Sequence, residues 1–231
     1  MLDYVKEEKE ELRKNILLIR EEIKKGIGLD LTNKIKRFAL KYDLSEKLIK
    51  QKVQKDDLFV LCFIKEPNRQ SFHQRLAAEF IKSIPNINNF KLLPPGGAKA
   101  LYIISGQLQD GKNITTSKKP KSIDFVWKYE TQENGLVEFY ATHKYTKEGG
   151  GAQDNQFNDI KLFLDNAQSY NRTDKFFIAI CDGAYYNQLP YIQNKINYSN
   201  KISYLERIYG GLNKRVKVLE INQLQEFLES L

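Results

Sequence analysis

The hydrophobic positions in the first quarter of the chain recur at helical spacing. Ile16, Ile19 and Ile23 follow one another at steps of three and four within the charged stretch LDYVKEEKEELRKNILLIREEIKKG. Such spacing predicts an amphipathic helix whose charged residues face solvent. We therefore expect residues 1–57 to form a helical N-terminal region, followed by a separate domain over residues 58–231.

The next stretch, LTNKIKRFALKYDLSEKLIKQKV, has a helical pattern that breaks at Asp43 and restarts at Ser45. Serine is favoured immediately before a helix because its hydroxyl can accept hydrogen bonds from the free N–H groups of the first turn. Two short helices around a tight turn match the outline of a helix-turn-helix, whose second helix can enter a DNA major groove. Residues 30–55 are thus expected to be a DNA-contacting helix-turn-helix, a dimerisation element or, as is commoner for such an outline, a helical hairpin that only packs.

The remainder of the chain alternates between the hydrophobic pattern of helices and that of strands. Phe72, Leu76 and Phe80 lie at steps of four and predict a helix over residues 68–84. A strand interrupted by a Pro-Gly loop, a hairpin, a helix and the buried strand KFFIAICDG follow, and then a helix, a strand and a helix. The order α, β, β, β, α, β, α, β, α predicts an α/β fold, with a central mixed β-sheet flanked by helices.

The hairpin determines which of its side chains share a face. Its turn is expected near residues 130–135, in a register that places Asp124 opposite Ala141 and Thr142, and Glu138 opposite Trp127. Side chains alternate along a strand, so Thr142 and Lys144 share one face with Asp124. Glu138 lies on that face too, but six residues from Lys144 correspond to roughly 20 Å. Asp124, Thr142 and Lys144 are expected to converge, whereas Glu138 is not.

Composition adds a preference for an anionic partner. Lysine and arginine outnumber aspartate and glutamate by 37 to 29, which gives a net charge of +8, and hydrophobic residues make up 41% of the 231 residues. A chain of this length and hydrophobicity can bury a sizeable core. A basic excess of this size favours a polyanion such as nucleic acid.

Other classes of protein are disfavoured by what the sequence lacks. Cys62 and Cys181 lie in separate apolar runs, without the paired spacing of a cysteine-based zinc site, and both are expected to be buried. The charged N-terminus does not resemble a signal peptide, and no stretch approaches the about 18 apolar residues of a membrane span. We expect a cytoplasmic protein that does not enter the membrane.

An aspartate that opens one strand, next to a position two residues before a lysine on the neighbouring strand, suits phosphodiester hydrolysis. The carboxylate of Asp124 would hold a divalent metal that polarises the phosphate and lowers the pKa of a bound water. Lys144 would orient that water or stabilise the charge that develops on the phosphate. A site with few oxygen ligands favours Mg²⁺, which keeps several waters of its own.

These residues resemble the PD-(D/E)xK nuclease superfamily, in particular the type II restriction endonucleases. KPKSIDFVW places a proline four residues before Asp124, and ATHKYT supplies Thr142, His143 and Lys144 as the "xxK" element. The helix with Glu79 is similar to the first core helix of the family, and GGGAQDNQFNDI and FFIAICDGAYY resemble the helix and the fourth strand that follow the lysine. The resemblance covers residues 68–220 and implies a restriction-endonuclease-like core.

The chain departs from this family at the second acid, because Thr142 stands where the family has an acidic residue two positions before the lysine. Two alternatives follow from the resemblance. Either Glu79 supplies the missing metal ligand, or the pairing is slipped and Glu138 is that ligand. The expected register of the hairpin favours Glu79. The remaining histidines are expected to be structural or to touch substrate, since His143 faces away from Lys144 and His73 lies on the helix of Glu79.

Basic and amide side chains near Asp124 are candidates for DNA contact. Lysines in the preceding loop and after the hairpin would meet the phosphate backbone, and amides at the start of the following helix suit adenine edges or phosphates. The candidates are Lys118, Lys119, Lys121, Lys147, Gln153, Asn155 and Gln156. For the amides, helix capping and packing are equally good interpretations.

The sequence thus predicts a Mg²⁺-dependent type II restriction endonuclease that cleaves double-stranded DNA at a specific sequence. Cleavage of both strands requires two sites, so a homodimer is expected. Two alternatives stay open. One is a non-enzymatic DNA-binding protein that uses the helix-turn-helix of residues 30–55, and the other is a repair nuclease that recognises DNA structure.

Overall fold

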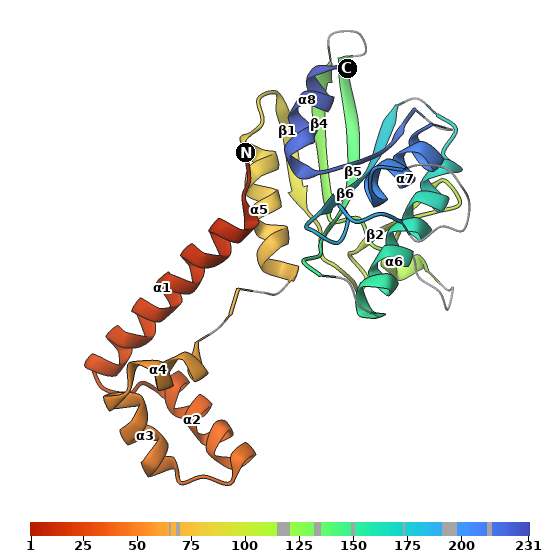
Figure 1. Cartoon of the computed structure of the whole chain (residues 1–231). Helices are drawn as coiled ribbons and strands as arrows, with labels where there is room; N and C mark the ends of the chain where they lie inside the picture. The colour runs from red at the N-terminus through yellow and green to blue at the C-terminus, as the bar shows by residue number, and fades with distance from the viewer. Residues whose placement is uncertain are drawn as a thin grey trace. The chain divides into compact units, whose positions relative to one another are not determined.

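The computed structural model describes residues 1–64, 66–67, 70–114, 121–131, 135–148, 151–172, 174–190, 198–211 and 214–231. The chain divides into two compact units (Figure 1). The first comprises residues 3–72, and the second comprises residues 73–231 together with the first two residues. Residues 58–72 therefore belong with the helical unit, beyond the boundary at residue 57 that the sequence pattern favoured.

The first unit is helical and has its own core. Its elements are α1 (Tyr4–Lys24), α2 (Leu29–Tyr42), α3 (Glu46–Lys55), α4 (Asp57–Val60) and the 3₁₀ turn η1 (Leu61–Phe63). One buried face of each longer helix meets the others, with Leu31 and Ile35 from α2 and Ile49 and Val53 from α3. The break that the sequence predicted lies between α2 and α3, where Asp43 adopts a left-handed conformation with φ of 52°.

The second unit is an α/β domain, as predicted. Its larger sheet has five strands in the order β1-β4-β5-β6-β7. The antiparallel neighbours are β1 with β4 and β4 with β5, and the parallel neighbours are β5 with β6 and β6 with β7. The strands are β1 (Ile87–Leu92), β4 (Phe125–Thr131), β5 (Gly135–Tyr145), β6 (Lys175–Asp182) and β7 (Val216–Leu219).

A second, two-stranded sheet corrects the predicted order. The region read as one interrupted strand contains β1 and also an antiparallel hairpin of β2 (Leu101–Ile104) and β3 (Gln107–Asp110). Its turn residues Ser105 and Gly106 both have positive φ, which is the geometry of a two-residue hairpin turn. A Cβ on Gly106 would lie 2.4 Å from the carbonyl oxygen of Ser169, so this position requires glycine.

Helices cover both faces of the larger sheet (Figure 1). One face packs against α6 (Gly151–Gln168) and α7 (Lys201–Leu205), and its core includes Tyr140 and Phe177. The other face is covered by α5 (Gln70–Ser83) and α8 (Leu224–Glu229), with Phe227 of α8 edge-on to Phe176. Short turns complete the unit: η2 (Gly111–Asn113), the π-helical turn η3 (Glu206–Gly210) and η4 (Ile221–Gln223).

The register of the β4–β5 hairpin is shifted by one residue from the predicted pairing of Glu138 with Trp127. Glu138 lies opposite Lys128, and Trp127 lies opposite Phe139. The shared face of Thr142 and Lys144 is unaffected because both belong to β5 itself. Ring stacking explains the pairing, since Phe139 is parallel to both Trp127 and Phe176, at 5.4 and 5.0 Å between ring centroids.

Two further expectations concern the surface. Cys181 is buried as predicted, but Cys62 is exposed, because it lies in η1 on the outer side of the helical unit. Within the described ranges, no helix is both long and apolar enough to cross a membrane.

Candidate functional site

Asp124 is the residue immediately before β4, and its backbone is hydrogen-bonded to the segments on both sides of it. Its N–H donates to the carbonyl of Ala141 in β5 at 2.8 Å, and its carbonyl accepts from the N–H of Leu93, beyond β1, also at 2.8 Å. The side chain is buried. A carboxylate held by two neighbouring segments of the sheet has little freedom to move, which is the condition for a preorganised site.

The carboxylate of Asp124 accepts hydrogen bonds from three groups. Lys121 Nζ is 2.8 Å from each oxygen. Oδ2 also accepts from the Thr142 hydroxyl at 3.1 Å and from the His143 N–H at 2.8 Å. A buried carboxylate needs partners of this kind to remain ionised. The hydroxyl of Thr142 therefore binds the carboxylate of Asp124 directly.

Lys144 lies two residues beyond Thr142 on the same face of β5 and is half-buried. Burial and the positive charge of Lys121 lower the pKa of Lys144, while Asp159 and Asp124 act in the opposite direction. Asp124 and Lys144 are thus close enough for their charges to interact, in a cluster that also contains Lys121 and Asp159. The cluster combines a fixed carboxylate with two ammonium groups, a combination suited to binding an anion such as a phosphate.

Asp159 is the acidic residue that the sequence did not single out. It lies on α6, the helix that covers this face of the sheet, and its side chain is exposed. The negative charge of Asp159 raises the pKa of Lys144, as that of Asp124 also does, and Asp159 is the stronger of the two causes. The sequence contained no clear indication of this, because the approach of α6 to the end of β5 is a tertiary contact.

The histidine between Thr142 and Lys144 faces the other side of the sheet. His143 is buried, and its Nε2 lies 3.1 Å from Oδ2 of Asp182, at the end of β6. Oδ1 of Asp182 accepts from the N–H of Ile221 at 2.9 Å. Asp182 thereby anchors the ring of His143. The backbone N–H of His143 in turn donates to the carboxylate of Asp124. His143 supports the site from behind, in agreement with its expected direction.

Glu79 is placed on the outward side of α5. Its carboxylate is 59% exposed and pairs with Arg75 at 3.3 Å, one turn earlier in the helix. The buried side of α5 carries Leu76 and Ala77 instead. The contacts that the structure gives for Glu79 do not include any member of the Asp124 cluster, so the second metal ligand suggested by the resemblance is not brought to Asp124 by these contacts.

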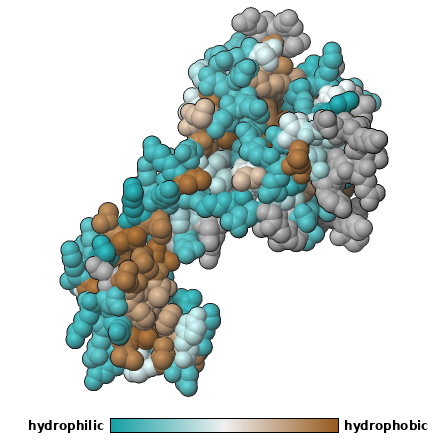
Figure 2. Space-filling view, viewed as in Figure 1, coloured by the Kyte–Doolittle hydropathy of each residue, from teal (hydrophilic) through white to brown (hydrophobic). Residues whose placement is uncertain are grey.

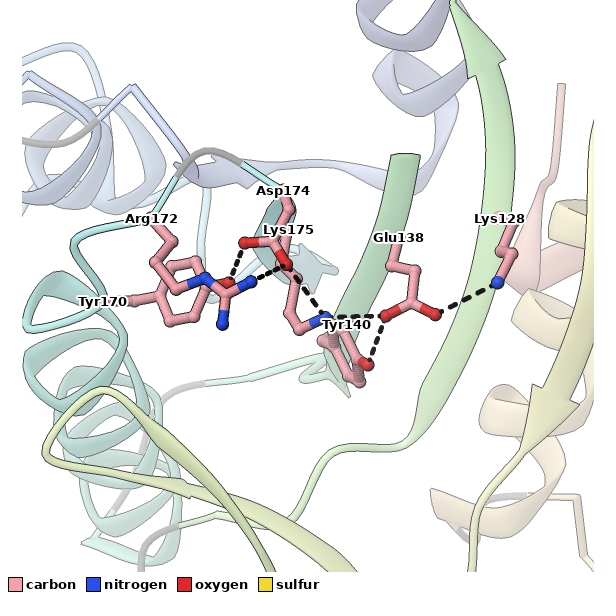
Figure 3. A network of polar contacts seen from close by, with 7 residues as sticks. All are labelled: Lys128, Glu138, Tyr140, Tyr170, Arg172, Asp174 and Lys175. Atoms are coloured by element: carbon pink, nitrogen blue, oxygen red, sulfur yellow. Dashed lines mark hydrogen bonds and ion pairs between the residues drawn. The ribbon is translucent and has the colours of Figure 1, made fainter. Parts of the chain in front are cut away.

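Glu138 belongs to a different polar network, at the other end of β5 (Figure 3). Its carboxylate accepts from Lys175 Nζ and from the hydroxyl of Tyr140, each at 2.9 Å, and lies 3.4 Å from Lys128 Nζ. The network continues through Asp174 to the hydroxyl of Tyr170 and to Arg172. Hydrogen bonds, first of all from Lys175, hold the pKa of Glu138 below its ordinary value. Glu138 is fully engaged across β4, β5 and β6.

The candidate DNA-contacting residues have different environments. Lys147 and Asn155 are exposed, as contact with DNA would require. The side-chain carbonyl of Gln156 accepts from the Thr146 hydroxyl at 3.0 Å, so this amide connects α6 to the end of β5. Lys121 points at Asp124 and is 14% exposed. Lys118, Lys119 and the side chain of Gln153 lie outside the described residues.

His73 and Tyr145 form a tilted ring pair. The ring of His73, on α5, lies 4.1 Å from that of Tyr145 at the end of β5. His73 is buried, in agreement with the structural role expected for it.

The ligand that this site offers to a Mg²⁺ ion is the carboxylate of Asp124. Both of its oxygens face the ammonium of Lys121, so a metal ion would have to share the carboxylate with that ammonium or displace it. In the described part of the chain, no group of three or more His, Cys, Asp and Glu side chains could hold a metal. A closed protein cage is therefore not formed there, whereas Mg²⁺ commonly binds through one or two carboxylates and keeps its waters.

No family model matches this chain, and neither the curated proteins nor the solved structures contain a match to it.

Proposed function

We propose that this protein is a Mg²⁺-dependent type II restriction endonuclease that hydrolyses phosphodiester bonds of double-stranded DNA at a specific sequence. The observation that carries the proposal is the convergence of Asp124, Thr142 and Lys144 on one face of the sheet. The Thr142 hydroxyl donates to Asp124, and Lys144 follows two residues later on the same strand. The basic net charge of +8 supports an anionic substrate.

The site lies where ligands are commonly bound in open α/β sheets. Thr142 and Lys144 are near the carboxyl end of β5, and β6 runs parallel to it, with Lys144 opposite Cys181. The loops that follow parallel strands line a cleft outside the carboxyl ends of those strands, and ligands commonly bind in such clefts. Asp124 reaches the same place from the antiparallel strand β4, because it lies at the start of that strand.

In the proposed reaction, Asp124 holds Mg²⁺, which when bound supplies Lewis-acid polarisation of the phosphate and a more acidic water. The Lys144 ammonium binds the scissile phosphate and stabilises the charge that develops on its oxygens. Water attacks the phosphorus in line and releases a proton to solvent, the opposite P–O bond breaks, and the leaving oxygen takes a proton from solvent. Thr142 and the main chain of His143 keep the carboxylate of Asp124 in place.

Two residues of this chain are candidates for the second acidic residue of the site, which would assist Asp124. The resemblance favours Glu79, whereas the electrostatic environment of Lys144 favours Asp159. Glu138 is the weaker candidate because its carboxylate is already engaged by Lys175, Tyr140 and Lys128. We propose a homodimer, since two such sites acting on opposite strands give a double-strand break.

Cleavage of supercoiled plasmid DNA tests the proposal. The purified protein is incubated with plasmid in Mg²⁺ and, separately, in EDTA, and the products are resolved on a gel. Discrete fragments that require Mg²⁺ and disappear in Asp124→Asn are expected. Cleavage without fixed positions would favour a structure-specific repair nuclease. A gel shift without cleavage in Mg²⁺ or Mn²⁺ would show that the chain is a DNA-binding protein without nuclease activity.

A further inference from the structure

The helical unit contains a two-helix segment with a tightly constrained turn. α2 ends at Tyr42, Asp43 takes a left-handed conformation, and α3 begins at Glu46. The N–H of Leu44 donates to the carbonyl of Ala39 at 2.9 Å, which closes the end of α2. Asp43 is one of the residue types that accept this conformation at low cost. The turn therefore sets the direction in which α3 leaves α2.

Packing fixes the rotation of α3 about its own axis. Ile49 and Val53, four residues apart, are buried in the core of the helical unit together with Ala39 of α2. The opposite side of α3 is consequently directed to solvent. It carries Lys47, Leu48, Gln51, Gln54 and Lys55, all of which are exposed. Apart from Leu48, these side chains are long and polar, and none of them is acidic.

The positive charge of the chain is concentrated in this segment. Residues 29–55 contain eight lysines and arginines against three aspartates and glutamates, a net charge of +5 out of +8 for the whole chain. Residues 1–28, which also belong mainly to the helical unit, contain seven of each kind and are neutral. α3 alone has four lysines and one glutamate. A basic stripe on one helix is the electrostatic footprint of a nucleic-acid contact.

We propose that α3 is a recognition helix that enters the major groove of double-stranded DNA. An α-helix with its side chains is about 10–12 Å across, which suits a groove about 12 Å wide, and the ten residues of α3 make about three turns that can lie in it. Gln51, at the centre of the outward side, reads base edges, and a glutamine amide can bind adenine through two hydrogen bonds. Lys47 and Lys55, on either side of Gln51, bind backbone phosphates. The proposal is independent of cleavage by the Asp124 cluster.

A protein partner is the competing occupant of this surface. Leucines of the helical unit are exposed, among them Leu48 and Leu58, which border a hollow of about 610 Å³ beside α3 (Figure 2 shows hydrophobic side chains on the exposed surface of this unit). The other four residues of the same hollow, however, are Gln51, Lys52, Lys55 and Asp56, so its charged side chains are two lysines and one aspartate. Two copies that met through this side of α3 would bring equal positive charges together, which opposes self-association. DNA has the complementary charge.

The test measures DNA binding by the full chain in EDTA, so that cleavage plays no part. Fluorescence anisotropy with a duplex of mixed sequence gives the affinity at several salt concentrations. Lys47→Gln with Lys55→Gln is expected to weaken binding about tenfold and to reduce the slope of log K against log salt by about two. The matched control, Arg13→Gln with Lys14→Gln, removes the same charge from exposed positions of α1 and is expected to leave both quantities nearly unchanged.

Base readout is tested by selection from a library of random duplexes. The wild-type chain is expected to enrich a defined sequence, and Gln51→Ala to lose the preference at one or two of its positions while keeping its affinity for mixed DNA. Circular dichroism establishes that each variant is folded. Equal losses in the α3 variant and the α1 control, or absence of duplex binding by the wild type, would overturn the proposal. So would a dimer that Leu48→Gln dissociates while the α3 lysine variant binds DNA normally.

Discussion

The ammonium of Lys121 lies 2.8 Å from each carboxylate oxygen of Asp124 and neutralises that buried charge. The two side chains are 14% and 1% exposed, so the pair is largely removed from water. A divalent ion at Asp124 must therefore share the carboxylate with Lys121 or displace it. This relationship makes the metal requirement of the proposed enzyme testable without measuring cleavage.

Lys121→Met is expected to tighten the binding of divalent metal about tenfold, because it removes the competing cation. The same variant leaves a buried carboxylate without its main counter-charge, so the metal-free protein should lose about 3 kcal/mol of stability. Mg²⁺ should restore most of that loss by binding to the folded state. Mn²⁺ binding followed by electron paramagnetic resonance and urea unfolding in EDTA and in Mg²⁺ are the two measurements.

The control for this prediction is Lys112→Met, which removes an exposed lysine from η2. It should bind Mn²⁺ and respond to Mg²⁺ as the wild type does. If Lys121→Met and Lys112→Met bind Mn²⁺ equally well, then Lys121 does not compete with the metal. If neither the wild type nor Lys121→Met binds Mn²⁺, then Asp124 is not a metal ligand.

The three residues that converge on the site should contribute unequally to cleavage. Asp124→Asn and Lys144→Met are expected to lower the rate about 10³-fold, since each removes a charge that acts on the phosphate. Thr142→Ala removes one hydrogen bond to the carboxylate and should cost about tenfold. Single-turnover cleavage of a plasmid measures all three. Lys91→Met, an exposed lysine of β1, is the matched control and should cleave normally. A loss in Thr142→Ala as large as that in Asp124→Asn would give Thr142 a direct catalytic role.

The alternation of side chains was sufficient to place Thr142 and Lys144 on one face, and this holds in the structure because both lie on β5. The same reasoning was wrong by one residue for Glu138, which lies opposite Lys128. The position of the turn was too loosely defined to fix the pairing, and the stacking of Phe139 on Trp127 and Phe176 decides it.

Other parts of the site depend on contacts that a linear pattern does not reveal. Lys121 approaches Asp124 from an irregular segment, where spacing does not predict a direction. His143 and Asp182 are 39 residues apart and meet because β5 and β6 run parallel. The β2–β3 hairpin, by contrast, did leave a detectable pattern in the sequence. Ser105 and Gly106 are typical of a two-residue turn, between runs that can pair.

The acid that assists Asp124 can be identified by comparing two conservative variants. Asp159→Asn is expected to reduce cleavage about tenfold, because it removes a negative charge that favours the ammonium form of Lys144. Glu79→Gln is expected to have less effect, since Glu79 is exposed and paired with Arg75. Both variants conserve shape, and thermal unfolding should be nearly unchanged in each. A complete loss of cleavage in Glu79→Gln with normal folding would instead identify Glu79 as the second metal ligand.

Glu138→Gln should separate stability from cleavage. The carboxylate accepts charged hydrogen bonds from Lys175 and lies beside Lys128, so its replacement should cost about 2 kcal/mol at neutral pH. The hydrogen bond from Lys175 is the first cause that lowers the pKa of Glu138 from its ordinary value of 4.5. The stabilisation is therefore fully present above pH 4.5 and is lost as the pH falls through the lower, folded-state pKa.

Urea unfolding at neutral pH and at pH about 3 measures this dependence, and the difference between wild type and Glu138→Gln should shrink on acidification. Glu130→Gln, at an exposed position of β4, is the control and should change stability little at either pH. Cleavage by Glu138→Gln at neutral pH should stay within about twofold of the wild type, because its carboxylate is engaged at the far end of β5 from Lys144. If Glu138→Gln stays folded but cleavage is abolished, the metal site would lie at Glu138, and Asp124 with Lys121 would be a structural ion pair.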